Sequence, residues 1–311
     1  SMYQHADEQL RALMNIPSSH SIFFASSATE IWERIILNTV QHKSAHFYSG
    51  SFGKKFCEFA QKLGKTTQAY VSEHGEGFPN LPEYKIDKDV ELICTTQNET
   101  SSGVALRPEL IHVLKQRYHS TLICTDIVSS APYPQLDYTY IDSAFFSVQK
   151  AFGLPAGLGV WIVNDKCIAK SETVLNTGAH NTLADYVKNY KTFETPSTPN
   201  TLGIYLLGKI AEDMNKLGID KMRASIDERS AILYRIDNDA VQPLVKDLAV
   251  RSATTIVYKS TLSAKQWNEK LQAQKLIVAS GYGPYKESEI RIANFPAISD
   301  EAFEALVKAL S

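Results

Sequence analysis

Short apolar segments alternate with amphipathic segments from about residue 20 to about residue 165. The apolar segments are too short for helices and are bounded by polar or turn-forming residues, which is typical of buried strands. They predict seven strands, at residues 21–24, 45–48, 68–71, 90–95, 121–125, 142–148 and 159–163. Between them, apolar residues recur with helical spacing and predict helices at residues 29–40, 52–63 and 108–118.

Strands that alternate with helices are typical of a mostly parallel sheet with helices on both faces, so we predict an α/β fold. In such sheets, ligands bind at the edge where the carboxyl ends of the strands meet. Polar residues that directly follow the predicted strands are therefore the first candidates for a functional site.

The pattern changes after about residue 181, where it becomes helical and includes one long element over residues 202–217. A smaller α+β unit follows, with strands expected at 254–257, 276–279 and 289–293 and helices at 265–274 and 300–310. We expect a large domain over residues 1–200, a helical connection over 201–240 and a small C-terminal domain over 241–311. A chain of 311 residues is also long enough for two cores.

Composition narrows the range of partners. The formal net charge of −2 indicates no surface for nucleic acid, and no segment approaches the ~20 apolar residues of a membrane span. His42 and His46 have the i,i+4 spacing of a helical metal pair, but two surface histidines are the simpler interpretation, and we expect no metal. The cysteines lie inside apolar stretches and favour a reducing cytoplasm; they are Cys57, Cys94, Cys124 and Cys167.

Lys150 is the first candidate for chemistry. It follows the apolar segment 144–148 and precedes the Gly/Pro-rich loop 153–157. A desolvated lysine loses its proton more easily and becomes a nucleophile that forms a Schiff base with a carbonyl. A solvated lysine at a strand end is the ordinary alternative for such a residue considered alone.

Three further polar groups follow predicted strands. Residues 26–30 supply three small hydroxyl side chains and a glutamate at a helix start, suited to an anion or simply to capping the helix. Residues 98–103 supply amide and hydroxyl groups, and Asp126 places a carboxylate at the end of a buried strand. With Lys150 they form the set that pyridoxal phosphate requires: a phosphate cup, an acid for the ring nitrogen, a hydroxyl donor and a lysine.

These segments resemble the class V (fold-type I) aminotransferases, which are pyridoxal-phosphate enzymes, and most closely the phosphoserine aminotransferases. The resemblance extends over nearly the whole chain. The segments that carry it are Leu10 to Pro17, Asn98 to Val104, Thr125 to Ser130, Ser147 to Lys150, Pro155 to Gly157 and Ser197 to Tyr205.

The resemblance implies roles for individual residues. Lys150 would form the internal aldimine and shuttle the substrate proton, and Asp126 would pair with the pyridine nitrogen. Phe52 stands where relatives often place a tryptophan on the cofactor ring, although an ordinary core aromatic is the alternative. The phosphate would be held by Ser27, Ala28, Thr29 and Gln149, and the ring hydroxyl by Thr100.

The resemblance also implies a substrate site and a partner. Arg291 matches the arginine that binds the substrate α-carboxylate; its alternative is an exposed strand arginine in a salt bridge. Ser197 and Thr198 would reach the cofactor phosphate of a neighbouring subunit, which makes the protein a homodimer with shared active sites.

One departure from the family pattern bears on the substrate. Phosphoserine aminotransferases usually carry a His-Arg pair for the substrate phosphate, whereas residues 280–287 contain no such pair and offer only Lys286. A second substrate-binding His-Arg of the family lies in an upstream segment that is absent from this sequence, whose abrupt start suggests that residues upstream of Ser1 are not included.

The favoured hypothesis is therefore a cytoplasmic transaminase of the phosphoserine aminotransferase type in serine biosynthesis. It would transfer an amino group between an L-amino acid, such as phosphoserine or glutamate, and a 2-oxo acid. A class V transaminase acting on alanine or serine with glyoxylate or pyruvate is the alternative that the missing His-Arg pair motivates.

A binding module and a cysteine desulfurase are weaker hypotheses. A catalytically silent binding module would not need a buried amine that faces a carboxylate. A cysteine desulfurase would need a cysteine in a mobile loop, and neither Cys57 nor Cys167 lies in a loop-like stretch.

Overall fold

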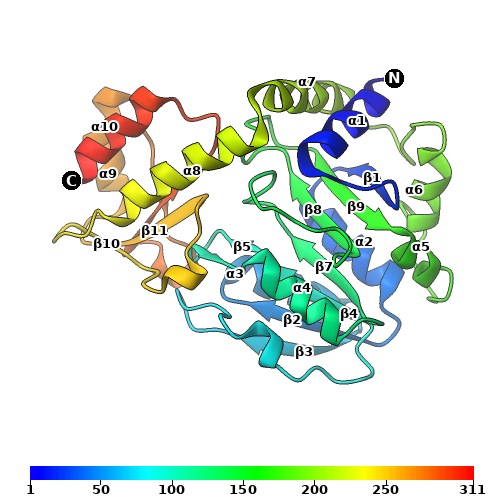
Figure 1. Ribbon diagram of the computed structural model, residues 1–311. Helices are drawn as coiled ribbons and strands as arrows, with labels where there is room; N and C mark the ends of the chain where they lie inside the picture. Colours follow the sequence, from blue (N-terminus) through cyan, green and yellow to red (C-terminus); the bar gives the residue numbers. More distant parts are fainter.

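The computed structural model describes residues 1–311 and contains two separate main sheets (Figure 1). The larger sheet has seven strands in the order β1-β9-β8-β7-β4-β2-β3. Only β9 runs against its neighbours, so the predicted mostly parallel α/β sheet is confirmed. The strands are β1 (His20–Ala25), β2 (Lys43–Tyr48), β3 (Thr66–Val71), β4 (Leu92–Thr96), β7 (Leu122–Asp126), β8 (Ser143–Ser147) and β9 (Gly159–Asn164).

Helices cover both faces of this sheet because successive strand residues point to opposite sides. Ile22 and Phe24 of β1 join one hydrophobic cluster, whereas Phe23 joins another. The first cluster lies under α1 (Met2–Met14), α4 (Pro108–Arg117) and α7 (Thr201–Leu217). The second lies under α2 (Ala28–Thr39), α3 (Ser51–Lys62) and α6 (Leu183–Tyr190).

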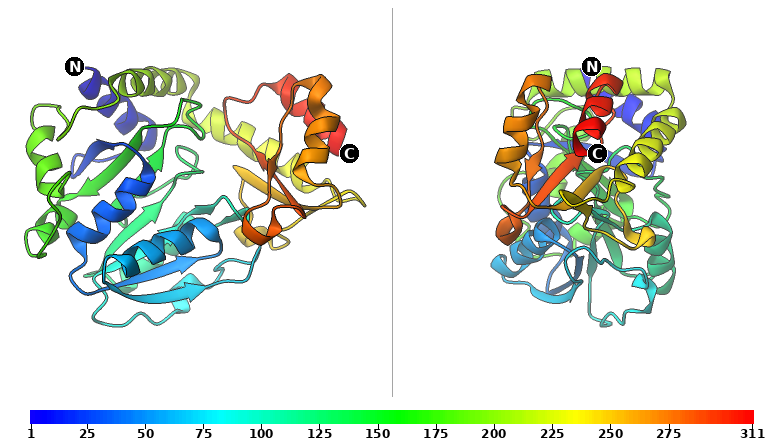
Figure 2. Two further views of the ribbon diagram at one scale, coloured as in Figure 1. Left: turned by 180° about the vertical axis from the view of Figure 1, so that it is seen from behind. Right: turned by 90° about the vertical axis from the view of Figure 1, so that its left-hand side faces the viewer.

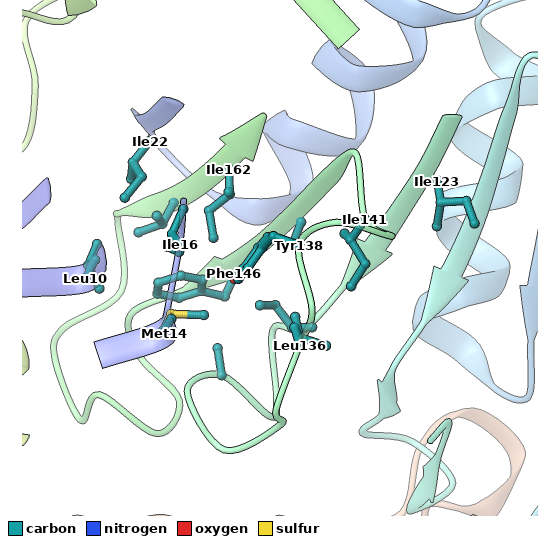
Figure 3. Packing of buried hydrophobic residues seen from close by; sticks show 14 of the residues in the cluster. Leu10, Met14, Ile16, Ile22, Ile123, Leu136, Tyr138, Ile141, Phe146 and Ile162 are labelled. Atoms are coloured by element: carbon teal, nitrogen blue, oxygen red, sulfur yellow. The ribbon is translucent and has the colours of Figure 1, made fainter. Parts of the chain in front are cut away.

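The first cluster is the larger of the two and contains 34 buried residues. Figure 3 shows part of it, where Leu10 and Met14 of α1 face Phe146 and Ile162 on the sheet. Helices α1 and α7 lie side by side above this region (Figure 1). The cluster therefore packs the helices against the large sheet and holds the ends of its strands in place.

His46 is not the surface histidine that its spacing from His42 suggested. It lies inside β2 and is buried, and its Nε2 is 2.9 Å from the Ser44 hydroxyl. Because His46 belongs to a strand, the two histidines do not form a helical i,i+4 pair.

Short elements complete the large sheet's surroundings. They are the hairpin β5 (Asn98–Glu99) and β6 (Val104–Ala105), helix α5 (Asp165–Ser171) and a 3₁₀ turn at Leu81–Glu83. The sequence pattern did not predict these elements, because two-residue strands and single helical turns are too short to show periodicity.

The second sheet is antiparallel, with four strands in the order β10-β11-β13-β12. Its strands are β10 (Val241–Pro243), β11 (Thr255–Ser260), β12 (Ala279–Ser280) and β13 (Glu289–Ala293). Helices α8 (Ile219–Tyr234), α9 (Ala264–Leu271) and α10 (Asp300–Leu310) contribute Leu233, Trp267 and Phe303 to its separate hydrophobic cluster. Further 3₁₀ turns span Leu248–Val250, Gln272–Gln274 and Gly283–Tyr285.

The strand expected at residues 276–279 is wrong except at its last residue. The N–H of Val278 donates to the side chain of Asn268, and the Val278 carbonyl accepts from the same amide. These bonds occupy the groups that a sheet ladder would use, so β12 begins only at Ala279.

The chain passes from one sheet to the other along α7 and α8, which meet at Gly218 with a φ of 92°. The N-terminus lies beside α7 and the C-terminus at the end of α10, on the second sheet's side (Figure 2). The hydrophobic cluster of the second sheet already includes Leu233 and Ile236, so the division near residue 240 stays a prediction. None of the helices is both long enough and apolar enough to cross a membrane.

Candidate active site

A cavity of about 490 Å³ lies at the carboxyl edge of the large sheet. Strands β1, β4, β7 and β8 all run in one direction, so the residues that follow them meet at this edge. The wall is formed by Ser27, Ala28, Thr29, Trp32, Phe52, Lys55, Glu58, Phe59, Lys62, Thr96, Asn98, Thr100, Asp126, Val128, Ser147, Gln149 and Lys150. Eight of the eleven residues predicted for the site therefore share one cavity.

Asp126 ends β7 and is 3% exposed. Its Oδ1 accepts a hydrogen bond from the N–H of Val128 at 2.8 Å. Burial nevertheless raises the pKa of the carboxyl to about 7, because one backbone donor does not replace the lost hydration. A cationic group beside this carboxylate would restore its ionised form.

Lys150 lies in the turn after β8. The turn is closed by the N–H of Gly153, which donates to the Lys150 carbonyl at 3.0 Å, and Gly153 has a φ of 65° that favours glycine. The Lys150 amine makes no hydrogen bond or ion pair. Burial lowers the pKa of Lys150, the nearby Arg291 lowers it further, and Asp126 acts in the opposite direction. The amine is thus shifted toward its neutral, nucleophilic form.

The start of α2 forms a cup of donors on the opposite wall. The Ser27 hydroxyl accepts from the N–H of Glu30 at 3.1 Å and caps the helix. The N–H of Ala28 donates to the Ser147 hydroxyl at 3.2 Å, while the N–H groups of Ser27 and Thr29 have no partner in the protein. Free N–H groups at the positive end of a helix dipole suit an anion such as phosphate.

Helix α3 begins at the same cavity and is held there by a buried carboxylate. Glu99, 1% exposed, accepts from the N–H of Gly53 at 2.9 Å and from the N–H of Phe52 at 3.3 Å. Gly50 packs so closely that a Cβ there would lie 2.3 Å from the Ser101 hydroxyl. These contacts fix Phe52 in the cavity wall, beside Thr100 from the β5–β6 hairpin.

Arg291 lies on β13 at the margin of the cavity rather than in its wall. Its Nε donates to the Ser280 carbonyl at 2.7 Å and its Nη1 to the Thr100 carbonyl at 3.3 Å. Burial lowers the pKa of its guanidinium, and no carboxylate pairs with it. The salt-bridge alternative is therefore not what the structure shows, and Nη2 remains free for an anion.

Ser197 and Thr198 lie outside this cavity. They border a second hollow of about 380 Å³ together with Ser26 and Glu30. The Ser197 hydroxyl bonds only the side chain of Asn181, at 3.3 Å. Within one chain, the structure does not bring these two residues to Lys150.

The residues present fit pyridoxal phosphate. The cavity offers unpaired donors at the start of α2, an amine without a partner and a buried carboxyl with one hydrogen bond. The indole Nε1 of Trp32 is buried without a hydrogen bond of ordinary geometry, and it lies near the Asp126 carboxyl, whose pKa it lowers. Orphaned polar atoms of this kind indicate a polar ligand, and the cofactor has a phosphate, an aldehyde and a ring nitrogen to meet them.

Sequence reasoning missed several residues of the cavity wall, including Trp32, Lys55 and Ser147. Trp32 lies one helical turn after Ala28 and so shares its face of α2, and Ser147 lies two residues before Gln149. These spacings were available in the sequence. For Lys55 the only available signal was its position three residues after Phe52.

The fold and this cavity define a pyridoxal-phosphate enzyme, and comparison with known proteins specifies the class. The family model for aminotransferase class-V matches residues 1–284. The chain belongs to this family and is therefore a transaminase whose cofactor is pyridoxal 5′-phosphate.

Similar proteins are phosphoserine aminotransferases. The enzyme of that name from Rhodococcus opacus is 26% identical over 97% of this chain and 82% of its own length. A crystal structure of a phosphoserine aminotransferase from Cytophaga hutchinsonii is 42% identical, with a TM-score of 0.96 over 99% of this chain and 87% of that one. An aspartate aminotransferase from Thermus thermophilus, 19% identical with a TM-score of 0.86, shares the fold over 99% of this chain and 89% of that one. The resemblance inferred from the sequence is confirmed.

Proposed function

We propose that this transaminase transfers the amino group between phosphoserine and a 2-oxo acid, with glutamate and 2-oxoglutarate as the other pair. The observation that carries the proposal is the 42% identity to a phosphoserine aminotransferase at a TM-score of 0.96. The unpaired Lys150 beside the buried Asp126 supports the transamination itself. Such a reaction belongs to serine biosynthesis.

Bound pyridoxal phosphate supplies an electron sink for the electron pair that remains when a proton leaves the substrate α-carbon. In our proposal the Lys150 amine would accept that proton at Nζ and hold it for the later proton return. The lowered pKa of Lys150 favours this, because a base must be neutral before it can accept a proton.

Asp126 and the start of α2 would hold the cofactor in place. The Asp126 carboxylate would pair with a positive charge on the cofactor ring, and that ion pair would offset the burial that raises the pKa of Asp126. Ser27, Ala28, Thr29 and Gln149 would bind the phosphate, Thr100 the ring hydroxyl, and Phe52 the face of the ring.

Arg291 would bind the substrate α-carboxylate. Two carbonyls orient its guanidinium through Nε and Nη1, so the free Nη2 is presented in a fixed direction. A guanidinium held in this way binds a carboxylate with geometric specificity that an ammonium lacks.

The functional unit in this proposal is a homodimer. Ser197 and Thr198 lie at the surface, outside their own chain's cofactor cavity, as expected of residues that reach a neighbouring subunit's phosphate. Sedimentation of the protein should give a dimer, and Thr198→Ala should lose cofactor faster during dialysis without changing the fold. A monomer with full activity would contradict the shared site.

The buried, free cysteines fit a cytoplasmic protein.

The test of the reaction is a visible absorption spectrum of the purified protein with pyridoxal phosphate, followed by L-glutamate. We expect the band of the protein-bound cofactor to bleach, and phosphohydroxypyruvate to restore it. Restoration by pyruvate or glyoxylate but not by phosphohydroxypyruvate would assign the chain to the alanine or serine type.

A further inference from the structure

Within one chain, Lys286 does not supply a cation near the proposed substrate position. Lys286 borders a different hollow, together with Lys265 and Glu269 of α9. It does not line the cavity that holds Lys150. A substrate with a second anionic group therefore needs another positive charge.

Lys55 is a cation at the right place. It projects from the first turns of α3 into the wall of the cofactor cavity. Its Nζ donates to the hydroxyl of Tyr282 at 2.7 Å, which ties α3 to the segment before β13. The two residues are 227 positions apart in the sequence.

Tyr282 connects Lys55 to Arg291. The Arg291 Cζ lies 5.8 Å from the centre of the Tyr282 ring, and the Lys55 Nζ lies 5.1 Å from the same centre. The Phe52 ring, in the cavity wall, is 5.0 Å from the Tyr282 ring. Tyr282 thus contacts both cations at the margin of the cavity.

Neither cation has a carboxylate partner. The neighbouring ion pair on α3 joins Lys54, not Lys55, to Glu58. Arg291 is bound only by carbonyl oxygens. Glu99 and Glu289 lie near enough to Arg291 to act on the pKa of its guanidinium, but neither forms an ion pair with it, so both cations remain available to an anion with two charged ends.

We propose that Lys55, oriented by Tyr282, binds the distal anionic group of the substrate while Arg291 binds its α-carboxylate. The substrate class is then α-amino acids and 2-oxo acids with an anionic side chain, whether phosphate or carboxylate. The inference rests on the proposed transamination, and it assigns to Lys55 the task that the absent His-Arg pair performs in relatives.

Lys62 also lines the cavity but does not suit this role. It lies seven residues further along α3, and its Nζ packs 5.8 Å from the Phe59 ring rather than against Tyr282. No contact links Lys62 to Arg291. Lys55 is the cation that shares a contact residue with the α-carboxylate site.

The test compares kcat and KM of the holoenzyme for phosphoserine, glutamate and alanine in the wild type, Lys55→Met, Lys55→Arg and Lys286→Met. Loss of a charge-assisted hydrogen bond predicts a roughly tenfold to hundredfold lower kcat/KM for phosphoserine and glutamate with Lys55→Met. The loss should lie in KM, and alanine should be affected less than about threefold. Lys55→Arg should restore most of the activity, and Lys286→Met should resemble the wild type.

Calorimetric binding to the Lys150→Ala protein gives a readout without turnover. We expect Lys55→Met in that background to weaken the binding of phosphoserine and of 2-oxoglutarate, but not the binding of pyruvate. A wild type that uses glutamate but not phosphoserine would contradict the proposed substrate and leave Lys55 tested by the glutamate and alanine comparison. Equal losses for anionic and neutral side chains, or no loss for either, would overturn the role of Lys55.

Discussion

The two sides of the active-site cavity are built differently. The cofactor side consists of residues at strand ends and one helix start of a single sheet, represented by Ser27, Asp126 and Lys150. The proposed substrate side joins Lys55 of α3 to Tyr282 and Arg291 near the second sheet. The first side depends on one rigid core, whereas the second depends on how two sheets meet.

The two proposed sides also differ in their secondary structure. The cofactor side is fixed by parallel strands with buried residues throughout. The substrate side is made of a short 3₁₀ turn, a two-residue strand and surface side chains, which can change without disturbing the large sheet. The two proposed sides nevertheless meet on helix α3, which carries both Phe52 and Lys55.

The largest effect should come from breaking the cofactor side at Lys150. Lys150→Ala removes both the nucleophile and the proton carrier, so we expect kcat to fall by roughly three or more orders of magnitude. Stopped-flow or coupled assays with glutamate would measure it. An Ala variant that retained the visible band of the bound cofactor and normal turnover would disprove this role, with Lys286→Met as the matched lysine control.

A second effect on the cofactor side concerns pH and folding. The folded protein without cofactor holds the Asp126 proton up to about pH 7, because burial raises the pKa, whereas the unfolded chain releases it near the ordinary value of 3.8. The contribution of this carboxyl to the free energy of unfolding is therefore fully present below about pH 4 and is lost as the pH rises to 7.

Urea unfolding of the cofactor-free protein tests this prediction. Between about pH 5 and pH 8 the free energy of unfolding of the wild type should fall by roughly 2–3 kcal/mol more than that of Asp126→Asn, whose side chain does not titrate. Equal pH slopes for the two proteins would show that Asp126 titrates normally in the folded state.

A smaller effect is expected on the substrate side at Arg291. Arg291→Lys keeps the charge but removes the planar fork that Ser280 and Thr100 orient. We expect kcat/KM to fall roughly tenfold to a hundredfold for every amino acid, because all share the α-carboxylate. A loss restricted to substrates with anionic side chains would instead place Arg291 at the distal group.

The smallest effect should come from the contact that supports the substrate side. His74 Nε2 lies 2.9 Å from Glu289 Oε1, and its ring stacks on Tyr285 at 3.8 Å between ring centres. His74→Ala should lower stability by about 1–3 kcal/mol and raise KM severalfold with little change in kcat. His42→Ala is the matched control, and an unchanged KM would show that β13 keeps Arg291 in place without this contact.

Much of the large sheet was predictable. The apolar segments matched all seven strands because buried strands are short and continuous in sequence. Asp126 and Lys150 were identifiable because they directly follow such segments. The small sheet was predicted less well, since β10 was missed and Val278 bonds Asn268 instead of a strand.

The sequence by itself determined the large sheet, the class of enzyme and most of the predicted residues that share one cavity, because periodicity and strand-end position are local properties. Only the tertiary structure decided that Glu99 holds the start of α3, that Trp32 lies near the Asp126 carboxyl, and that Lys55 meets Tyr282. These contacts join residues far apart in the chain, and no local sequence pattern predicts such a contact. It follows from how the two sheets pack.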